Sequence, residues 1–252
     1  MIRMYFMRTI KSPKFFISVF GVFIICMLRL TNGIFTATNI VDDIDLLVNL
    51  DAFRKVIAVF AAIPFASTFA DEWSSNMSLS CVLRSSPKKY AWSQVTVCFL
   101  SAFITTLLGF LLYWLVDSFR LPLYIPDGNP LTPPYGVFLA NGLAWLNILL
   151  VIVDFSLSCA MWSVTGLLIS SIFPSSFIAL CTPFVASYLL ERITLNFPDQ
   201  FNLLFVALSS VNILNNPWAS FLWIVCLLSL LSAVFGAVFA YVIERRLKNE
   251  FT

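Results

Sequence analysis

Apolar runs of about the length needed to cross a bilayer recur along this 252-residue chain. The chain is 60% hydrophobic and only 11% charged, whereas about one quarter of the residues in a soluble domain are charged. The runs are also longer and more uniformly apolar than the alternating strands of a membrane barrel. The sequence therefore predicts an all-α, polytopic membrane protein.

The runs predict six transmembrane helices in one membrane domain that covers residues 1–252. The expected spans are roughly Phe15–Phe35, Val56–Ala70, Val95–Val116, Val137–Ser163, Phe177–Leu190 and Trp218–Ile243. Pro64 and Pro183 are expected to bend the second and fifth spans, because proline removes a helical hydrogen bond. In this scheme ten Lys and Arg residues lie on the side of the two termini and four on the other. The positive-inside rule then predicts that both termini are cytoplasmic.

Three connecting segments have distinct compositions. Residues 1–14 mix four cations with apolar residues, which suits an interfacial helix or a plain basic tail. A cleavable signal peptide is disfavoured because no small-x-small site follows. The proline-rich residues 117–136 predict a compact external loop. Residues 191–217 contain Phe201–Val211, which is apolar but too short to cross a bilayer, and this predicts an external re-entrant or interfacial segment.

A polar stretch, residues 70–94, separates the second and third expected spans. It begins with two acidic residues, which stabilise the start of a helix, and continues with apolar residues at i, i+4 and i+8. It predicts a cytoplasmic amphipathic helix of about three turns that docks a partner; the alternative is a solvated loop. Ser86 before Pro87 favours the start of the next helix. The candidate partner-contact residues are the acidic pair Asp71 and Glu72, the apolar stripe Trp73, Met77 and Cys81, and also Ser74 and Arg84.

Two ionisable residues, Arg29 and Asp154, fall inside expected spans, where an unpaired charge costs about 3 kcal/mol on insertion scales. They are expected to form a bridge between the first and fourth spans, or one of them lines a path for a polar substrate. The last span carries a stripe of small residues that lets another helix approach closely, from the same chain or from a second copy. This stripe consists of Ser229, Ala233, Gly236 and Ala240.

The inventory of residues disfavours several functions. The chain has no histidine, no GxxxxGK[ST] nucleotide loop and no CxxC pair among its six cysteines. We therefore predict no catalytic residues, no metal site and no cofactor bound by this chain. The net charge of +2 gives no indication of a nucleic-acid partner.

The order of segments, together with Glu72, Leu83-Arg84, Ser86-Pro87 and Tyr90, resembles the ABC-2 type transporter permease family. These residues are similar to the family's E…R…K pattern leading into the third span, although Gln94 stands where a lysine is commoner. The similarity covers nearly the whole chain.

The resemblance implies that Ala70 to Arg84 is a coupling helix seated on a separate ATPase subunit, with Ser170 to Ser176 as a minor contact. It also implies two ATPases that hold ATP and Mg, a second permease copy or paralogue, and an N-terminal elbow helix. The expected setting is the plasma (inner) membrane of a bacterium. Short permeases of this kind are similar to exporters of amphipathic peptides, including bacteriocin-immunity exporters. The alternatives are an exporter of lipid or glycan, the substrate-binding subunit of a vitamin importer, and a membrane-embedded enzyme.

Overall fold

Every regular element that the computed structural model describes is a helix. The description covers residues 2–31, 38–75, 86–125, 135–207, 214 and 216–250, with the backbone alone at 29–31 and 247–250. The long helices are α2 (Pro13–Thr31), α4 (Asp51–Ala62), α7 (Pro87–Asp117), α9 (Ala144–Ile172), α10 (Ser176–Thr194) and α12 (Pro217–Glu250). The short elements are α1 (Ile2–Ile10), α3 (Ile40–Asn49), α5 (Thr68–Ser74), α8 (Gly136–Ala140), the 3-10 helix η1 (Asp199–Phe201) and α11 (Leu203–Ala207).

Four of the described helices, α7, α9, α10 and α12, are long and apolar enough to span a membrane. The bent pair formed by α1 and the first part of α2, with 60° between its two parts, adds a fifth candidate if it counts as one span. The prediction of a helical membrane protein is therefore confirmed. The count of six spans is not reached on length and composition, because α4 is only 12 residues long.

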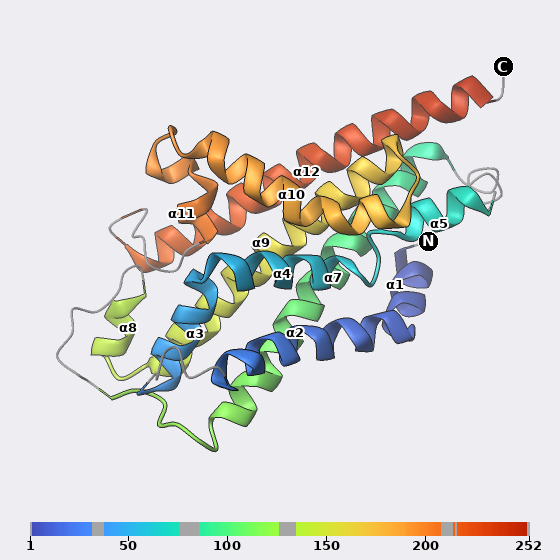
Figure 1. Cartoon of the computed structure of the whole chain (residues 1–252). Coiled ribbons are helices and arrows are strands. Elements are labelled where there is room, and N and C mark those ends of the chain that lie inside the picture. The colour runs from blue at the N-terminus through green and yellow to red at the C-terminus, as the bar shows by residue number, and fades with distance from the viewer. Residues whose placement is uncertain are drawn as a thin grey trace.

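Helix α9 is the centre of the bundle. In its most apolar 18-residue window 89% of the residues are buried, against 22% in α10 and in α12. Helices α7, α10 and α12 pack around it, and α2 covers α7 (Figure 1). A helix that is apolar all round is typical of such a buried position.

Successive long helices run in alternating directions, so the bundle has two distinct ends (Figure 1). One end carries α1, α5 and the last turns of α12, and both chain termini lie there; we call it the termini end. The opposite end carries α3, α8 and α11, and we call it the loop end.

The second expected span differs from the prediction. Pro64 does not bend a continuous helix over Val56–Ala70: α4 ends at Ala62, residues 63–67 form turns, and α5 begins at Thr68. The reason is that proline has no N–H to bond a preceding turn and its ring clashes with that turn.

The fourth expected span begins later than Val137. The chain forms α8, breaks at Asn141 to Leu143 and resumes as α9, because Gly142 adopts a φ of +73° that helical residues do not have. Helix α9 then continues past Ser163 to Ile172. The expected start of the third span is also shifted, from Val95 to Pro87.

Ser86 confirms its predicted role at the start of α7. Its side chain accepts a hydrogen bond from the backbone N–H of Lys89, and Pro87 takes the first helical position.

The segment between the first and second expected spans, which carries Asp42, Asp43 and Asp45, forms the helix α3. Asn39 caps its start by accepting a hydrogen bond from the backbone N–H of Asp42. Asp43 is buried and accepts a hydrogen bond from Tyr113 of α7. The sequence signal for α3 was therefore its cap, since its acidic residues are also typical of an external loop.

Pro183 lies inside the continuous helix α10 and lacks the N–H that would bond to the carbonyl of Ala179. Gly166 of α9 lies directly against that carbonyl, so that an added Cβ would stand 2.5 Å from the oxygen. The two helices therefore approach closely where the proline has freed a carbonyl.

We expect Gly166→Ala to lower the free energy of unfolding by about 1–2 kcal/mol. Alanine gains about 1 kcal/mol of helix propensity, but the clash is with backbone, and overpacking costs about 1–3 kcal/mol. Thermal unfolding of the purified protein measures the change. The control is Ser171→Ala, which removes only a hydrogen bond to Leu168 within the same helix. A Gly166→Ala protein at least as stable as wild type would contradict the close packing.

Candidate functional site

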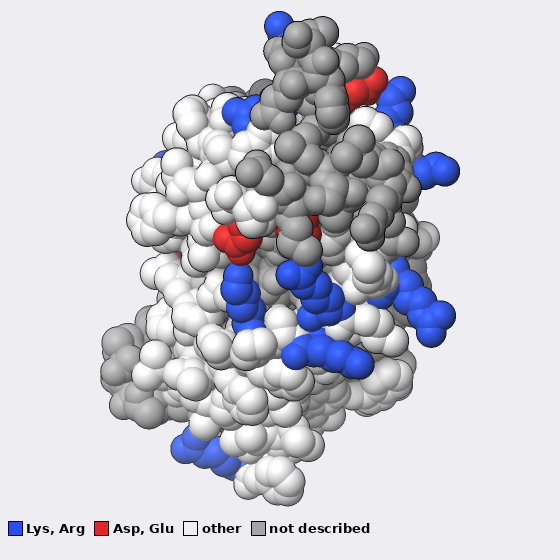
Figure 2. Space-filling view, turned by 90° about the vertical axis from the view of Figure 1, so that its right-hand side faces the viewer, with Lys and Arg blue, Asp and Glu red and all other residues white. Residues whose placement is uncertain are grey.

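The termini end carries most of the exposed cations. Figure 2 shows this end of the bundle, and several Lys and Arg side chains, drawn in blue, lie on it. The exposed cations of the elements at this end are Arg3, Arg8, Lys11, Lys14, Lys88, Lys89 and Arg245. The charge distribution that the sequence predicted is therefore collected on one face of the molecule.

The short helix α5 lies within this face and is anchored by aromatic packing. The ring of Phe69 is fully buried, 5.5 Å from the ring of Phe239 on α12. The ring of Trp73 lies 5.6 Å from that of Phe69 and is only partly buried. Such ring pairs add about 0.5–1.5 kcal/mol beyond the area that they bury. Helix α5 is therefore fixed to α12 on one side.

Glu72 connects α5 to α1 and α7 inside the protein. Its Oε2 accepts hydrogen bonds from the Tyr90 hydroxyl at 2.8 Å, from Gln94 Nε2 at 2.8 Å and from the Tyr5 hydroxyl at 3.4 Å. Arg8 Nη1 lies 3.9 Å from Oε1. A buried carboxylate needs such donors, because it has lost its hydration.

Asp71 connects α5 to two further helices, and Trp73 adds a second contact with α12. Asp71 forms an ion pair with Lys14 of α2 at 3.1 Å and accepts a hydrogen bond from the Ser176 hydroxyl of α10 at 2.6 Å. The guanidinium of Arg246 on α12 lies 5.6 Å from the centre of the Trp73 ring. Its Nη2 also donates to the backbone carbonyl of Ile172, at the end of α9, at 2.6 Å.

We call Asp71, Glu72 and Trp73, with these partners, the α5 hub. These three residues of α5 contact side chains from α1, α2, α7, α10 and α12. A cavity of about 330 Å³ lies beside the hub, between α1, the turn after α4 and α5. Any displacement of α5 would therefore act on most of the bundle through direct contacts.

The predicted contact residues meet different outcomes. Asp71, Glu72, Trp73 and Ser74 lie together on α5, whereas Met77, Cys81 and Arg84 lie outside the described residues. Helix α5 begins at Thr68, three residues before Asp71, so that Asp71 lies in its first turn. Glu72 was expected at the partner contact. The residue is only 4% exposed, and its carboxylate accepts hydrogen bonds inside the protein. Asp71 and Ser74 remain exposed.

Asp154 is buried in α9, and its Oδ2 accepts a hydrogen bond from the Tyr135 hydroxyl. The side chain of Arg29 lies outside the described residues, so the bridge between these two remains a prediction.

The small-residue stripe on α12 divides into two parts. Gly236 and Ala240 are buried, and Gly236 packs against Val95 and Trp92 of α7, which is contact within the chain. Ser229 and Ala233 are exposed on the described surface.

Sequence reasoning missed the donors to Glu72. Tyr90 and Gln94 stand four residues apart, on one face of α7, and this spacing was the available signal.

Sequence reasoning also missed a buried ion-pair cluster at the loop end, formed by Arg54, Lys55 and Glu191. Within the described ranges no group of three His, Cys, Asp or Glu side chains is placed to hold a metal ion.

We expect Tyr90→Phe to lower the free energy of unfolding by about 1–3 kcal/mol, because it removes the 2.8 Å donor to a buried carboxylate. Tyr5→Phe is the matched control, since its 3.4 Å contact is long for a hydroxyl donor and should matter less. Thermal unfolding in one detergent compares them. Equal effects would contradict the view that the shorter hydrogen bond from Tyr90 stabilises Glu72 more than the longer one from Tyr5.

A comparison of the chain with protein-family models, curated proteins and solved structures finds no match.

Proposed function

We propose that this chain is the membrane-spanning subunit of an ATP-driven exporter of the ABC-2 type, and that the α5 hub is where a separate ATPase docks. One observation carries the proposal. A short, partly exposed helix at the cation-rich end of a membrane bundle is joined by hydrogen bonds or ion pairs to α1, α2, α7 and α10, and by a cation–π contact to α12. A partner that pushes on such a helix acts on the spans themselves.

The proposed topology has six passes and both termini in the cytoplasm of a bacterial cell. The alternating directions of α2, α4, α7, α9, α10 and α12 support it (Figure 1). In this scheme the second pass runs over Val56–Ala70, which comprises most of the short α4, the turns after it and the start of α5. The concentration of cations at the termini end supports the orientation, because positive residues remain on the cytoplasmic side.

The proposed mechanism is a change in packing that begins at α5. Closure of two ATPases on ATP and Mg would displace α5 in each of two permease copies. Glu72 would pass this displacement to α1 and α7, and Asp71 would pass it to α2 and α10. The ATPases would contact α5 differently in their open and closed states. This difference would shift the equilibrium between two packing arrangements of the helix bundle. The exposed Ser229 and Ala233 on α12 suit close contact with the second copy.

Amphipathic peptides are the proposed substrate class, on the family resemblance of short permeases; a lipid or a glycan is the alternative. The chain would contribute no catalytic group of its own, and ATP would be hydrolysed on the partner.

The test is to search the genes beside this one for an ABC ATPase, to express that ATPase with the chain and to measure ATP hydrolysis in lipid nanodiscs. We expect hydrolysis by the complex and none by the isolated chain, which lacks a nucleotide loop. Robust hydrolysis by the isolated chain would contradict the proposal.

A further inference from the structure

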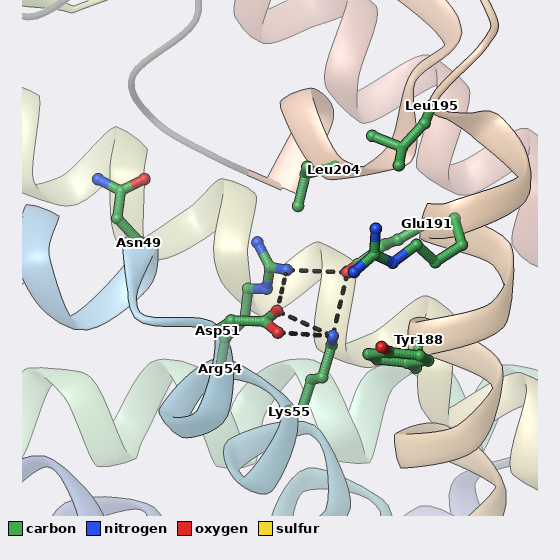
Figure 3. Close-up of a pocket in the computed structure, with 9 residues that line it drawn as sticks. Asn49, Asp51, Arg54, Lys55, Tyr188, Glu191, Leu195 and Leu204 are labelled. Carbon is green, nitrogen blue, oxygen red and sulfur yellow. Dashed lines mark hydrogen bonds and ion pairs between the residues drawn. The ribbon is translucent and has the colours of Figure 1, made fainter.

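The loop end holds a charged pocket that the proposed function does not use. A cavity of about 390 Å³ lies between the start of α4, the end of α10 and α11 (Figure 3). Its lining residues are Asn49, Asp51, Arg54, Lys55, Tyr188, Glu191, Arg192, Leu195 and Leu204. The lining thus combines three cations and two carboxylates with an apolar rim.

The two carboxylates are already matched by two of the cations. Arg54 Nη2 lies 2.8 Å from both Asp51 Oδ1 and Glu191 Oε2. Lys55 Nζ lies 2.8 Å from Asp51 Oδ1 and 3.6 Å from Glu191 Oε2. Burial raises the pKa of Asp51, but hydrogen bonds and charge from Lys55 and Arg54 outweigh it and hold this pKa below 3.8. Counted formally, the three cations and two carboxylates give the pocket one net positive charge.

Arg54 is also incompletely bonded. The residue is only 4% exposed, yet its Nε and Nη1 are buried without a hydrogen-bond partner. Figure 3 shows that its second terminal nitrogen points away from Asp51 and Glu191, into the space near Leu204. Buried guanidinium N–H groups without an acceptor are costly, so a site built in this way favours an acceptor that arrives from outside.

Arg192 supplies the accessible charge. It is exposed and has no ion-pair partner among the described residues, and its guanidinium lies 5.6 Å from the centre of the Tyr188 ring. Lys55 Nζ lies 4.4 Å from the centre of the same ring. Arginine binds phosphate oxygens well because its planar donors match their geometry.

The place of the pocket identifies the kind of acceptor. Helix α10 is one of the candidate membrane spans, and the pocket lies at its end, where the headgroup layer of a bilayer begins. Tyr188 and Arg192 are residue types that anchor helices at this level. The turns of α10 that precede the pocket residues expose apolar side chains, including Val185 and Leu189, which suit acyl chains.

We propose that this pocket binds the phosphate of an anionic phospholipid, with Arg192 making the first contact and Arg54 supplying the inner donors. The acyl chains would lie along the exposed apolar face of α10. Leu195 and Leu204 would form the apolar wall around the glycerol. The site is independent of any contact at the α5 hub, which lies at the other end of the bundle (Figure 1).

The test counts the phosphatidylglycerol molecules that the full chain retains in native mass spectrometry after release from nanodiscs. Arg192→Gln should weaken the tightest phosphatidylglycerol site about tenfold, as loss of a charge-assisted hydrogen bond predicts, without changing the melting temperature. Arg120→Gln is the matched control, because it removes an exposed cation at the same end but outside the pocket; we expect less than a twofold change. Equal losses in the two variants would overturn the site in favour of general surface charge.

Arg54→Lys keeps the charge but removes the Nε donor, and we expect it to weaken the same site. If this variant fails to fold, the comparison of Arg192→Gln with Arg120→Gln still decides.

Competition with glycerol 3-phosphate distinguishes a lipid site from a free-phosphate site. If glycerol 3-phosphate displaced the lipid with an affinity equal to that of the lipid, the acyl-chain contact would be contradicted. Displacement of the lipid by an amphipathic peptide with a free carboxyl end, but not by its amidated form, would assign the pocket to peptide carboxylates and overturn the lipid proposal.

Discussion

Glu72→Leu is expected to lower the free energy of unfolding by about 2–4 kcal/mol. The change removes the acceptor of the hydrogen bonds from the Tyr90 hydroxyl and the Gln94 amide, and loss of the acceptor of a buried donor costs about 1–3 kcal/mol. The shift would be measured as the melting temperature of the purified protein in one detergent.

The neighbouring carboxylate provides the control. Asp71→Asn removes a charge that pairs with Lys14 on the surface, where ion pairs contribute about 0–1 kcal/mol. If Asp71→Asn were as destabilising as Glu72→Leu, the burial of Glu72 would not be the cause of the loss.

The same site has a defined pH dependence. Burial raises the pKa of Glu72 above its ordinary value of 4.5, although hydrogen bonds from Tyr90 and the charge of Arg8 act in the opposite direction. The folded protein therefore holds this proton more tightly than the unfolded chain does. The contribution of Glu72 to stability must fall as the pH rises from about 4.5 through the folded-state pKa. Glu72→Gln should remove this part of the pH profile.

Trp73→Ala is expected to weaken binding of the proposed ATPase by more than tenfold. Truncation of an aromatic anchor at an interface commonly costs at least about 2 kcal/mol. Trp73 is suited to this role because one part of its ring packs on Phe69 while the rest stays exposed. The measurement is the amount of ATPase that copurifies at matched expression.

Trp73 also contacts Arg246, so a loss of binding must be separated from a loss of folding. The melting temperature of each variant without the ATPase makes this separation. Ser74→Ala, on the exposed side of the same helix, should have little effect on binding. Wild-type copurification of the Trp73→Ala protein would remove Trp73 from the docking surface.

The membrane class and the positions of most long helices could be predicted because each depends on a local stretch of sequence. Hydropathy identifies a span without knowledge of its neighbours. The cap of α7 is equally local, because Ser86 directly precedes the first residue of that helix. The breaks at Pro64 and Gly142 were missed in part because tertiary packing decides whether such a residue bends a helix or ends it.

The burial of Glu72 could not be predicted from the polar stretch itself. Its donors come from Tyr5, which is 67 residues away in the chain, and from Tyr90 and Gln94, which are 18 and 22 residues away. A carboxylate in a polar stretch is usually solvated, and only the return of α1 and α7 to one end of the bundle changes that. The charged pocket around Arg54 was missed for the same reason, since Glu191 lies 137 residues further on.

Site-specific photo-crosslinking tests the proposed docking at α5 most directly. A photoreactive amino acid at Ser74, which is exposed on α5, would be activated in membranes that contain the chain and the proposed ATPase partner. The same group at Val137, exposed on α8 at the opposite end, is the control. We predict a crosslink to the ATPase from position 74 and none from position 137, with the yield from position 74 reduced by Trp73→Ala. A crosslink from position 137 alone, or from neither position while the ATPase copurifies, would contradict docking at α5.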